Sequence, residues 1–165
     1  EHPIEITAYE FAQDRCGAGK YRGGAPFRRE YRIKVPEAVL QFRADRHTVR
    51  PYGLYGGKAG KPGSVHLASD GQPRYIGSKV TEKIAAGEIF SYVLPGGGGW
   101  GDPLERDPDA VLRDVRNEVI SAASARDVYG VVLTALPLAV DSTATAARRA
   151  ELAQNRQAGP ISWDD

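Results

Sequence analysis

The chain of 165 residues has no methionine and a single cysteine, Cys16. With one cysteine no disulfide can form within the chain, and such sparse use of cysteine favours a reducing compartment, so we expect the cytoplasm. A basic-then-apolar signal pattern is also missing near Glu1. Since translation begins with methionine, we interpret the sequence as the product of processing or excision, and as a candidate piece of a larger protein.

Long apolar runs are lacking too. No stretch approaches the roughly 18 apolar residues of a membrane span, so no membrane partner is expected. Hydrophobic residues make up 41% and charged residues 26%, which is typical of a globular domain, and the length suits a single domain with its own core. Basic residues are scattered among acidic ones without forming a stripe, which argues against a nucleic-acid partner.

Metal-binding and nucleophile motifs are sparse. The three histidines are His2, His47 and His66, and none lies within four residues of another or of Cys16. The sequence therefore predicts no metal site, although ligands from distant positions remain an alternative to surface or hydrogen-bonded histidines. Arg15 could lower the pKa of the adjacent Cys16 thiol, but an inert, small apolar role is favoured.

Composition divides the chain into two parts of one domain. Residues 1–101 hold 17 of the 19 glycines and an excess of basic residues, whereas residues 102–165 are acidic and rich in alanine. The net charge of +1 conceals this asymmetry. Opposite charge would let the two parts attract, although surface charge pairs contribute little to stability.

The first part has the pattern of β structure. Apolar and charged residues alternate over residues 30–35, as expected for a half-buried strand. Weaker strand signals and the turns between them favour a mainly antiparallel sandwich or barrel-like sheet over residues 1–100, with Asp70-Gly71 as the best hairpin turn. The further strands are expected at Ile4–Tyr9, Val39–Ala44, Ser64–Ala68, Arg74–Val80 and Ile89–Leu94.

The second part is predicted to be helical, which makes the fold class α+β. Asp107 and Pro108 have the residue types of a helix N-cap and first turn, and apolar residues at helical spacing follow to about residue 118. Ser121 can cap a short turn through Ala125, and the apolar residues 129–134 predict a strand covered on both faces.

A last helix is expected at residues 142–156, capped by Asp141 or Ser142 and ending near Gly159-Pro160. Its only large apolar side chain is Leu152. Such a helix should pack weakly or contact another chain.

Three glycine-rich segments remain, at residues 14–24, 51–60 and 95–103. Four consecutive glycines, Gly96–Gly99, are expected only where the backbone takes positive φ or approaches another group closely. A bare loop before a helix could receive an anion, and backbone amides with Lys and Arg can hold carboxylate or phosphate groups. The alternative is a set of structural connections, which is favoured because no Walker-type Gly-Lys-Ser/Thr follows.

Together these segments resemble the hydantoinase B/oxoprolinase family, near the C-terminal end of its long subunits. Residues 14–24 match the family's Asp-Ser-Gly-Gly-Ala-Gly-Lys-Tyr-Arg-Gly-Gly except at Arg15 and Cys16. Pro51-Tyr52-Gly53-Leu54-Tyr55-Gly56-Gly57 is similar to a second family element. A third runs through Pro95–Pro103, Arg106-Asp107-Pro108, Asp114-Val115 and Tyr129–Leu133. Further departures are Ala25-Pro26, and Glu118 where a glycine is typical.

The resemblance implies ATP-dependent chemistry on amides or ketones. A hydantoinase A-type subunit or domain would bind ATP with Mg and phosphorylate a small-molecule substrate, and the B-type component would hydrolyse or carboxylate the intermediate. The family's metal-binding residues lie in an N-terminal portion that this sequence lacks. We therefore expect the chain alone to bind no cofactor and to be inactive without that portion, which could hold a divalent metal, and the A-type partner.

Three functions remain open at this stage. A cyclic-amide hydrolase of hydantoinase or 5-oxoprolinase type is favoured, with an acetone or acetophenone carboxylase type and a non-catalytic assembly domain as alternatives. No catalytic residue is assigned. We expect the segments at residues 20–24 and 96–102 to converge into one polar wall, with candidate substrate or phosphate contacts from Gly17, Gly19, Lys20, Arg22, Gly23, Gly24, Gly97, Gly98, Asp102 and Arg106.

Overall fold

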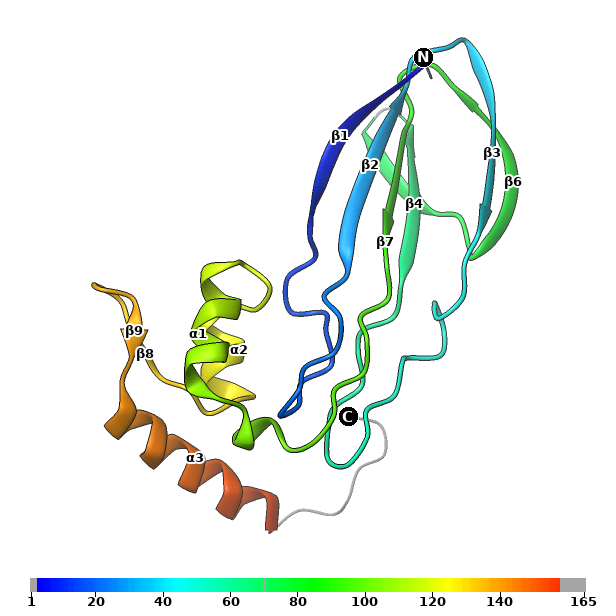
Figure 1. The fold of residues 1–165 in the computed structure, drawn as a ribbon. Coiled ribbons are helices and arrows are strands. Elements are labelled where there is room, and N and C mark those ends of the chain that lie inside the picture. The colour runs from blue at the N-terminus through cyan, green and yellow to red at the C-terminus, as the bar shows by residue number, and fades with distance from the viewer. Residues whose placement is uncertain (1–2, 70, 158–165) are drawn as a thin grey trace.

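The computed structural model describes residues 3–69 and 71–157 and shows an α+β architecture (Figure 1). A five-stranded antiparallel sheet has the order β1-β2-β7-β4-β5. Its strands are β1 (Ile4–Phe11), β2 (Phe27–Ile33), β4 (Ser64–Ser69), β5 (Gln72–Tyr75) and β7 (Ile89–Val93). The predicted antiparallel β structure is therefore confirmed.

A separate two-stranded antiparallel sheet, β3 (Glu37–Arg43) with β6 (Lys79–Ala85), lies beside the five-stranded sheet (Figure 1). Between the two sheets is a core of Ile33, Val65, Leu67, Ile84 and Phe90, all with less than a tenth of their surface exposed. Burying these side chains stabilises the β part through the removal of apolar surface from water.

The predicted hairpin around residue 71 is confirmed, since Ser69 pairs with Gln72 across the β4–β5 turn. The single strand expected over Arg74–Val80 is wrong. Gly77 has φ +86°, a conformation that interrupts the extended chain, and β6 leaves the five-stranded sheet to pair with β3 instead.

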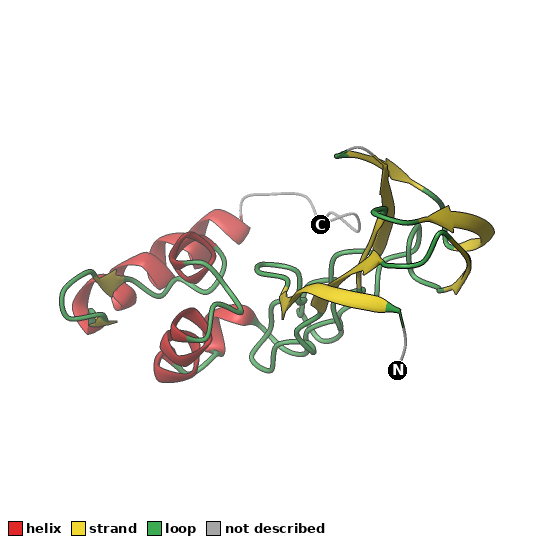
Figure 2. Ribbon diagram, turned by 90° about the horizontal axis from the view of Figure 1, so that it is seen from above, coloured by secondary structure: helices red, strands yellow, loops and turns green. Residues whose placement is uncertain are grey.

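The three glycine-rich segments form the middle of the molecule, between the strands and the helices (Figure 2). They are irregular apart from isolated β-bridges of Trp100 to Tyr21 and to Leu54. Backbone hydrogen bonds join them throughout, for example from the Tyr21 amide to the Trp100 carbonyl at 3.0 Å and from the Leu54 amide to the Gly99 carbonyl at 2.9 Å.

The helical part contains the short 3₁₀ turn η1 (Pro103–Glu105), α1 (Pro108–Arg116), α2 (Ala122–Asp127) and α3 (Ser142–Gln157). The predicted caps are confirmed: the Asp107 carboxylate accepts the Asp109 amide, and the Ser121 hydroxyl accepts the Ser124 amide. Asp141 caps α3 by accepting the Ala144 amide. The end expected for this helix, at residues 159–160, lies outside the described residues.

The strand predicted over residues 129–134 is mostly wrong. Only β8 (Leu133–Thr134) is extended, paired with β9 (Ala139–Val140). Gly130 has φ +63°, and the Val131 amide donates to the Ala125 carbonyl, so this stretch closes the end of α2 instead of joining a sheet. Tyr129 and Val131 fill a second core with residues of α1 and α2.

Glu118 has φ +57°, two residues beyond the end of α1. The left-handed conformation is common just after a helix and favours glycine, so the glycine that the resemblance leads us to expect here would suit this backbone.

No helix within the described ranges is long and apolar enough to cross a membrane.

Candidate functional site

The four-glycine run is the axis around which the other glycine segments pack. A Cβ on Gly96 would overlap the Arg15 carbonyl, and one on Gly98 would overlap the Tyr52 carbonyl. Gly97 faces the amide of Gly24. Only glycine fits at these positions, because the backbone of residues 14–24 and of residues 51–60 packs against the run from different sides and leaves no room for a Cβ.

Several backbone amides that could have received an anion are already bonded. The Gly17 amide donates to the Gly97 carbonyl at 2.8 Å, and the Gly97 amide donates to the Gly24 carbonyl at 3.0 Å. The Gly23 amide donates to the Gly17 carbonyl at 2.9 Å. Because each amide has one proton, these three candidate positions supply structural hydrogen bonds.

The predicted convergence of residues 20–24 with residues 96–102 is confirmed. The Lys20 amide donates to the Gly101 carbonyl at 3.2 Å, and Gly19 packs against the backbone of Trp100. The Cα of Gly24, by contrast, faces open space.

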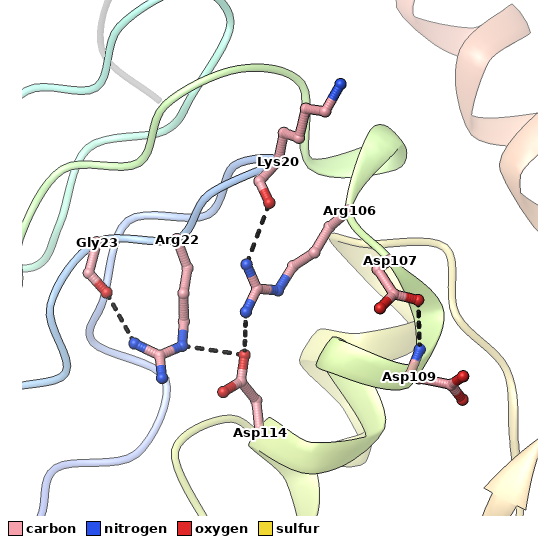
Figure 3. Close-up of polar contacts among 7 residues, drawn as sticks. All are labelled: Lys20, Arg22, Gly23, Arg106, Asp107, Asp109 and Asp114. Atoms are coloured by element: carbon pink, nitrogen blue, oxygen red, sulfur yellow. Dashed lines mark hydrogen bonds and ion pairs between the residues drawn. The ribbon is translucent and has the colours of Figure 1, made fainter.

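Two of the candidate cations meet on the Asp114 carboxylate, which the sequence interpretation quoted as part of a family motif but did not count among the candidate site residues (Figure 3). Arg22 Nε and Arg106 Nη2 both contact Asp114 Oδ2, at 3.0 and 2.8 Å. The Asp114 side chain is only 7% exposed, so the pair replaces its hydration. Its hydrogen bond to Arg22 raises the pKa of that guanidinium, although burial opposes the shift.

Further contacts tie the same arginines to the glycine segments (Figure 3). Arg22 Nη1 donates to the Gly23 carbonyl at 3.0 Å, and Arg106 Nη1 donates to the Lys20 carbonyl at 3.1 Å. The Arg22–Asp114–Arg106 cluster therefore joins the first glycine segment to α1.

Lys20 and Asp102 have different roles from these arginines. The Lys20 ammonium is 3.1 Å from Glu105, with both side chains largely exposed, so it remains accessible. The Asp102 carboxylate accepts the Leu104 amide at 2.8 Å and caps η1. The sequence signals for Asp114 were its place in the quoted family motif and its position three residues after Val111, on the buried face of α1.

Cys16 lies beside the arginine cluster without becoming an activated thiol. Burial raises the pKa of this thiol, and the opposing effect of Arg22 is smaller. This direction is opposite to the lowered pKa that the neighbouring Arg15 suggested, and the inert interpretation agrees with the packing of Cys16 against the second core.

An exposed aromatic group caps the glycine segments. The Trp100 ring centroid is 5.6 Å from that of Tyr21 and 5.4 Å from that of Tyr55, and all three rings are substantially exposed. Tyr55 has φ +53°, an uncommon conformation for an aromatic residue. Each of the three glycine-rich segments contributes one ring.

The metal that the resemblance implies has no donor set among the described residues: no three His, Cys, Asp or Glu side chains gather there. His47 instead lies 3.3 Å from the Tyr75 hydroxyl. We derive no metal-dependent step from these residues.

Comparison with known proteins identifies the class. Residues 1–103 match the hydantoinase B/oxoprolinase family, and the chain belongs to that family. An uncharacterized protein of Methanocaldococcus jannaschii is 40% identical over 131 residues, covering 79% of this chain and 23% of that protein. The caprolactamase subunit beta of Pseudomonas jessenii is 36% identical over 155 residues, covering 90% of this chain and 26% of the subunit.

Solved structures give the same assignment. The ATP-dependent caprolactamase from Pseudomonas jessenii superposes with a TM-score of 0.72 at 34% identity, over 90% of this chain and 26% of that chain. Nucleotide-free acetone carboxylase superposes with a TM-score of 0.83 over 97% of this chain and 26% of that chain, and at 23% identity it shows the shared fold alone. The chain spans about a quarter of the length of the relatives it matches.

Proposed function

We propose that this chain is the C-terminal part of a B-type component of an ATP-dependent enzyme that hydrolyses a cyclic amide. The observation that carries the proposal is the 36% identity to a caprolactamase subunit beta over 90% of this chain, within a hydantoinase B/oxoprolinase family match. The N-terminal portion of the B-type subunit and a hydantoinase A-type partner complete the enzyme in this proposal, and they supply the site for ATP with Mg.

In this enzyme the chain contributes a polar wall to the site of the phosphorylated intermediate. Lys20 is the candidate contact because its ammonium is accessible and its nearest carboxylate, Glu105, is itself exposed. Arg22 and Arg106 act as positioning residues, since their guanidinium groups are committed to Asp114 and to backbone carbonyls. A cation aimed at developing negative charge lowers the barrier to breakdown of such an intermediate.

A ketone carboxylase is the second candidate. Its support is the sequence match to the acetone carboxylase alpha subunit of Xanthobacter autotrophicus, which is 28% identical over 197 residues and covers 96% of this chain. The two candidates differ in product, because one opens a ring with water and the other forms a carbon–carbon bond.

The test reconstitutes this chain with an N-terminal B-type portion and an A-type subunit. Phosphate release is measured with hydantoin, 5-oxoproline, caprolactam and, separately, acetone plus bicarbonate. We expect ATP-dependent ring opening that needs all components, and no turnover by this chain alone. Carboxylated product without ring opening would support the carboxylase, and cyclic-amide turnover by this chain alone would contradict the proposed division of labour.

Lys20→Ala in the reconstituted enzyme should lower kcat by roughly 10²-fold if it touches the intermediate in the transition state. The matched control is Lys34→Ala, whose ammonium contacts Glu5 on β1 at the surface of the sheet. Equal turnover of the two variants would remove Lys20 from the proposed site.

A further inference from the structure

A cavity of about 640 Å³ lies away from the Lys20 side chain, between the first two glycine segments and α2. One wall carries three cations, Arg50, Lys58 and Lys61. Apolar side chains, among them Ala18 and Ile120, line another part of the cavity, and the remaining polar lining includes Asp14 and Asp127. A volume of this order suits a small organic molecule, and cations on an apolar wall favour an anionic one.

The carboxylates around this cavity are already engaged. Asp14 Oδ1 accepts the Ser121 amide at 2.8 Å, and Asp127 Oδ1 lies 3.2 Å from Arg148 Nη2. Although burial alone would raise the pKa of Asp14, hydrogen bonds from Ser124 and Ser121 hold it below its ordinary value.

The lysines of the cavity are less committed. Among residues 3–69 and 71–157, neither the Lys58 nor the Lys61 ammonium forms an ion pair within 4 Å. Lys61 lies close enough to Asp14 to help lower its pKa. Asp14 stays ionised near Lys61 and opposes an anion there, but the three cations of the lining outnumber its two carboxylates, so the cavity is electrostatically suited to a bound anion.

Tyr129 contributes its ring, not its hydroxyl, to the cavity. It lines the cavity but is only 2% exposed, and its hydroxyl is buried, so a molecule in the cavity contacts the ring. The groups that act electrostatically on this hydroxyl are Cys16 and the Arg22–Asp114–Arg106 cluster, and neither lysine of the cavity is among them.

We infer that this cavity binds a small organic anion, in which a carboxylate or phosphate group is held by Lys58 and Lys61 and a short apolar body lies over the Ala18 and Ile120 side. The Tyr129 ring adds to the lining of the cavity. This inference is independent of the proposed enzymatic function, because it concerns binding by the chain itself.

The test is calorimetric titration of the purified chain with hexanoate and with hexyl phosphate. Hexylamine and hexanol serve as cationic and neutral probes of the same apolar length. We expect saturable binding of at least one anion with Kd of about 1 mM or tighter. The anion with the lower Kd shows whether the cavity prefers a carboxylate or a phosphate head group. The inference also requires that hexylamine and hexanol bind more weakly than this anion. Equal binding of all four probes, or no binding of either anion, would overturn the inference.

Variants locate the binding. Lys58→Ala with Lys61→Ala should raise Kd roughly tenfold, because charge-assisted hydrogen bonds are lost. The matched control, Lys79→Ala with Lys83→Ala on β6, makes the same change in charge far from the cavity wall and should leave Kd unchanged. An equal effect of both double variants would mean non-specific attraction and would contradict the proposed site.

Tyr129→Phe keeps the ring and removes only the buried, unbonded hydroxyl, so neither the melting temperature nor Kd should change. A large rise in Kd would show that the anion lies at this hydroxyl and not at the lysines, and would contradict the proposed site. Amide chemical-shift changes on adding the anion should concentrate at residues 58–61 and 121–129.

Discussion

At the scale of single residues, neighbouring glycines in this chain have opposite roles. A Cβ on Gly23 would overlap the backbone of Gly97, whereas a Cβ on Gly24 would meet no atom within 4 Å. Neither glycine has positive φ. The difference between them is therefore one of space and not of backbone conformation.

Replacing each of these two glycines by alanine measures how tightly the glycine segments are packed. Gly23→Ala should destabilise the fold by about 2 kcal/mol or more, because backbone cannot move aside as a flexible side chain would. Gly24→Ala should be neutral or stabilise by up to about 1 kcal/mol through the reduced freedom of the unfolded chain. Urea denaturation of both variants tests this, and similar losses of stability would contradict the packing described above.

At the scale of elements, α3 is held by polar contacts more than by apolar burial. The Thr145 hydroxyl accepts the Val132 amide at 3.0 Å. Arg149 donates through Nε to the Tyr129 carbonyl at 3.2 Å and through Nη2 to the Arg106 carbonyl at 2.5 Å. The alanine-rich face predicted weak packing. These hydrogen bonds hold α3 in place where little apolar surface is buried.

Arg149→Ala should therefore loosen α3 locally. Loss of charged hydrogen bonds to two loop carbonyls should cost about 2 kcal/mol and speed amide hydrogen exchange within the helix. Arg148→Ala is the matched control, because Arg148 pairs with the largely exposed carboxylates of Asp127 and Glu151 and should cost about 1 kcal/mol or less. Equal exchange rates in the two variants would show that α3 is held in some other way.

At the scale of the whole molecule, the glycine segments connect two separate cores. One core lies between the five-stranded sheet and the two-stranded β3–β6 sheet, and the other lies among α1, α2 and the turn after α2. The Arg22–Asp114–Arg106 cluster spans the boundary between the first glycine segment and α1. We expect it to couple the helical part to the rest.

Arg22→Ala tests this coupling. Removing one partner of a nearly buried carboxylate is costly, but Asp114 keeps Arg106, so we expect a loss of about 2 kcal/mol. Helix melting followed by far-ultraviolet circular dichroism should then precede the loss of sheet structure. Lys20→Ala, which removes an exposed ion pair from the same segment, should change stability by about 0.5 kcal/mol or less. A single cooperative transition with unchanged midpoint in both variants would contradict the coupling.

Local features of this protein were determined by the sequence itself. Alternating residues in β2, the cap residues Asp107 and Ser121, and the turn near residue 71 act over a few neighbours, so their structures follow from short-range sterics and hydrogen bonding. The convergence of the glycine-rich segments was also predictable, but only with the help of the family resemblance.

Only the tertiary structure decided the contacts between residues that lie far apart in the sequence. Glycine allows close approach without saying to what, so the sequence could not show that Gly97 accepts from Gly17 and donates to Gly24. The departure of β6 to a second sheet and the use of Tyr129 as core instead of strand follow from competition between packing partners. The same holds for Arg22, because a cation on a glycine loop has the same local pattern whether it faces solvent or a buried carboxylate 92 positions away. Only the folded chain places Asp114 beside it.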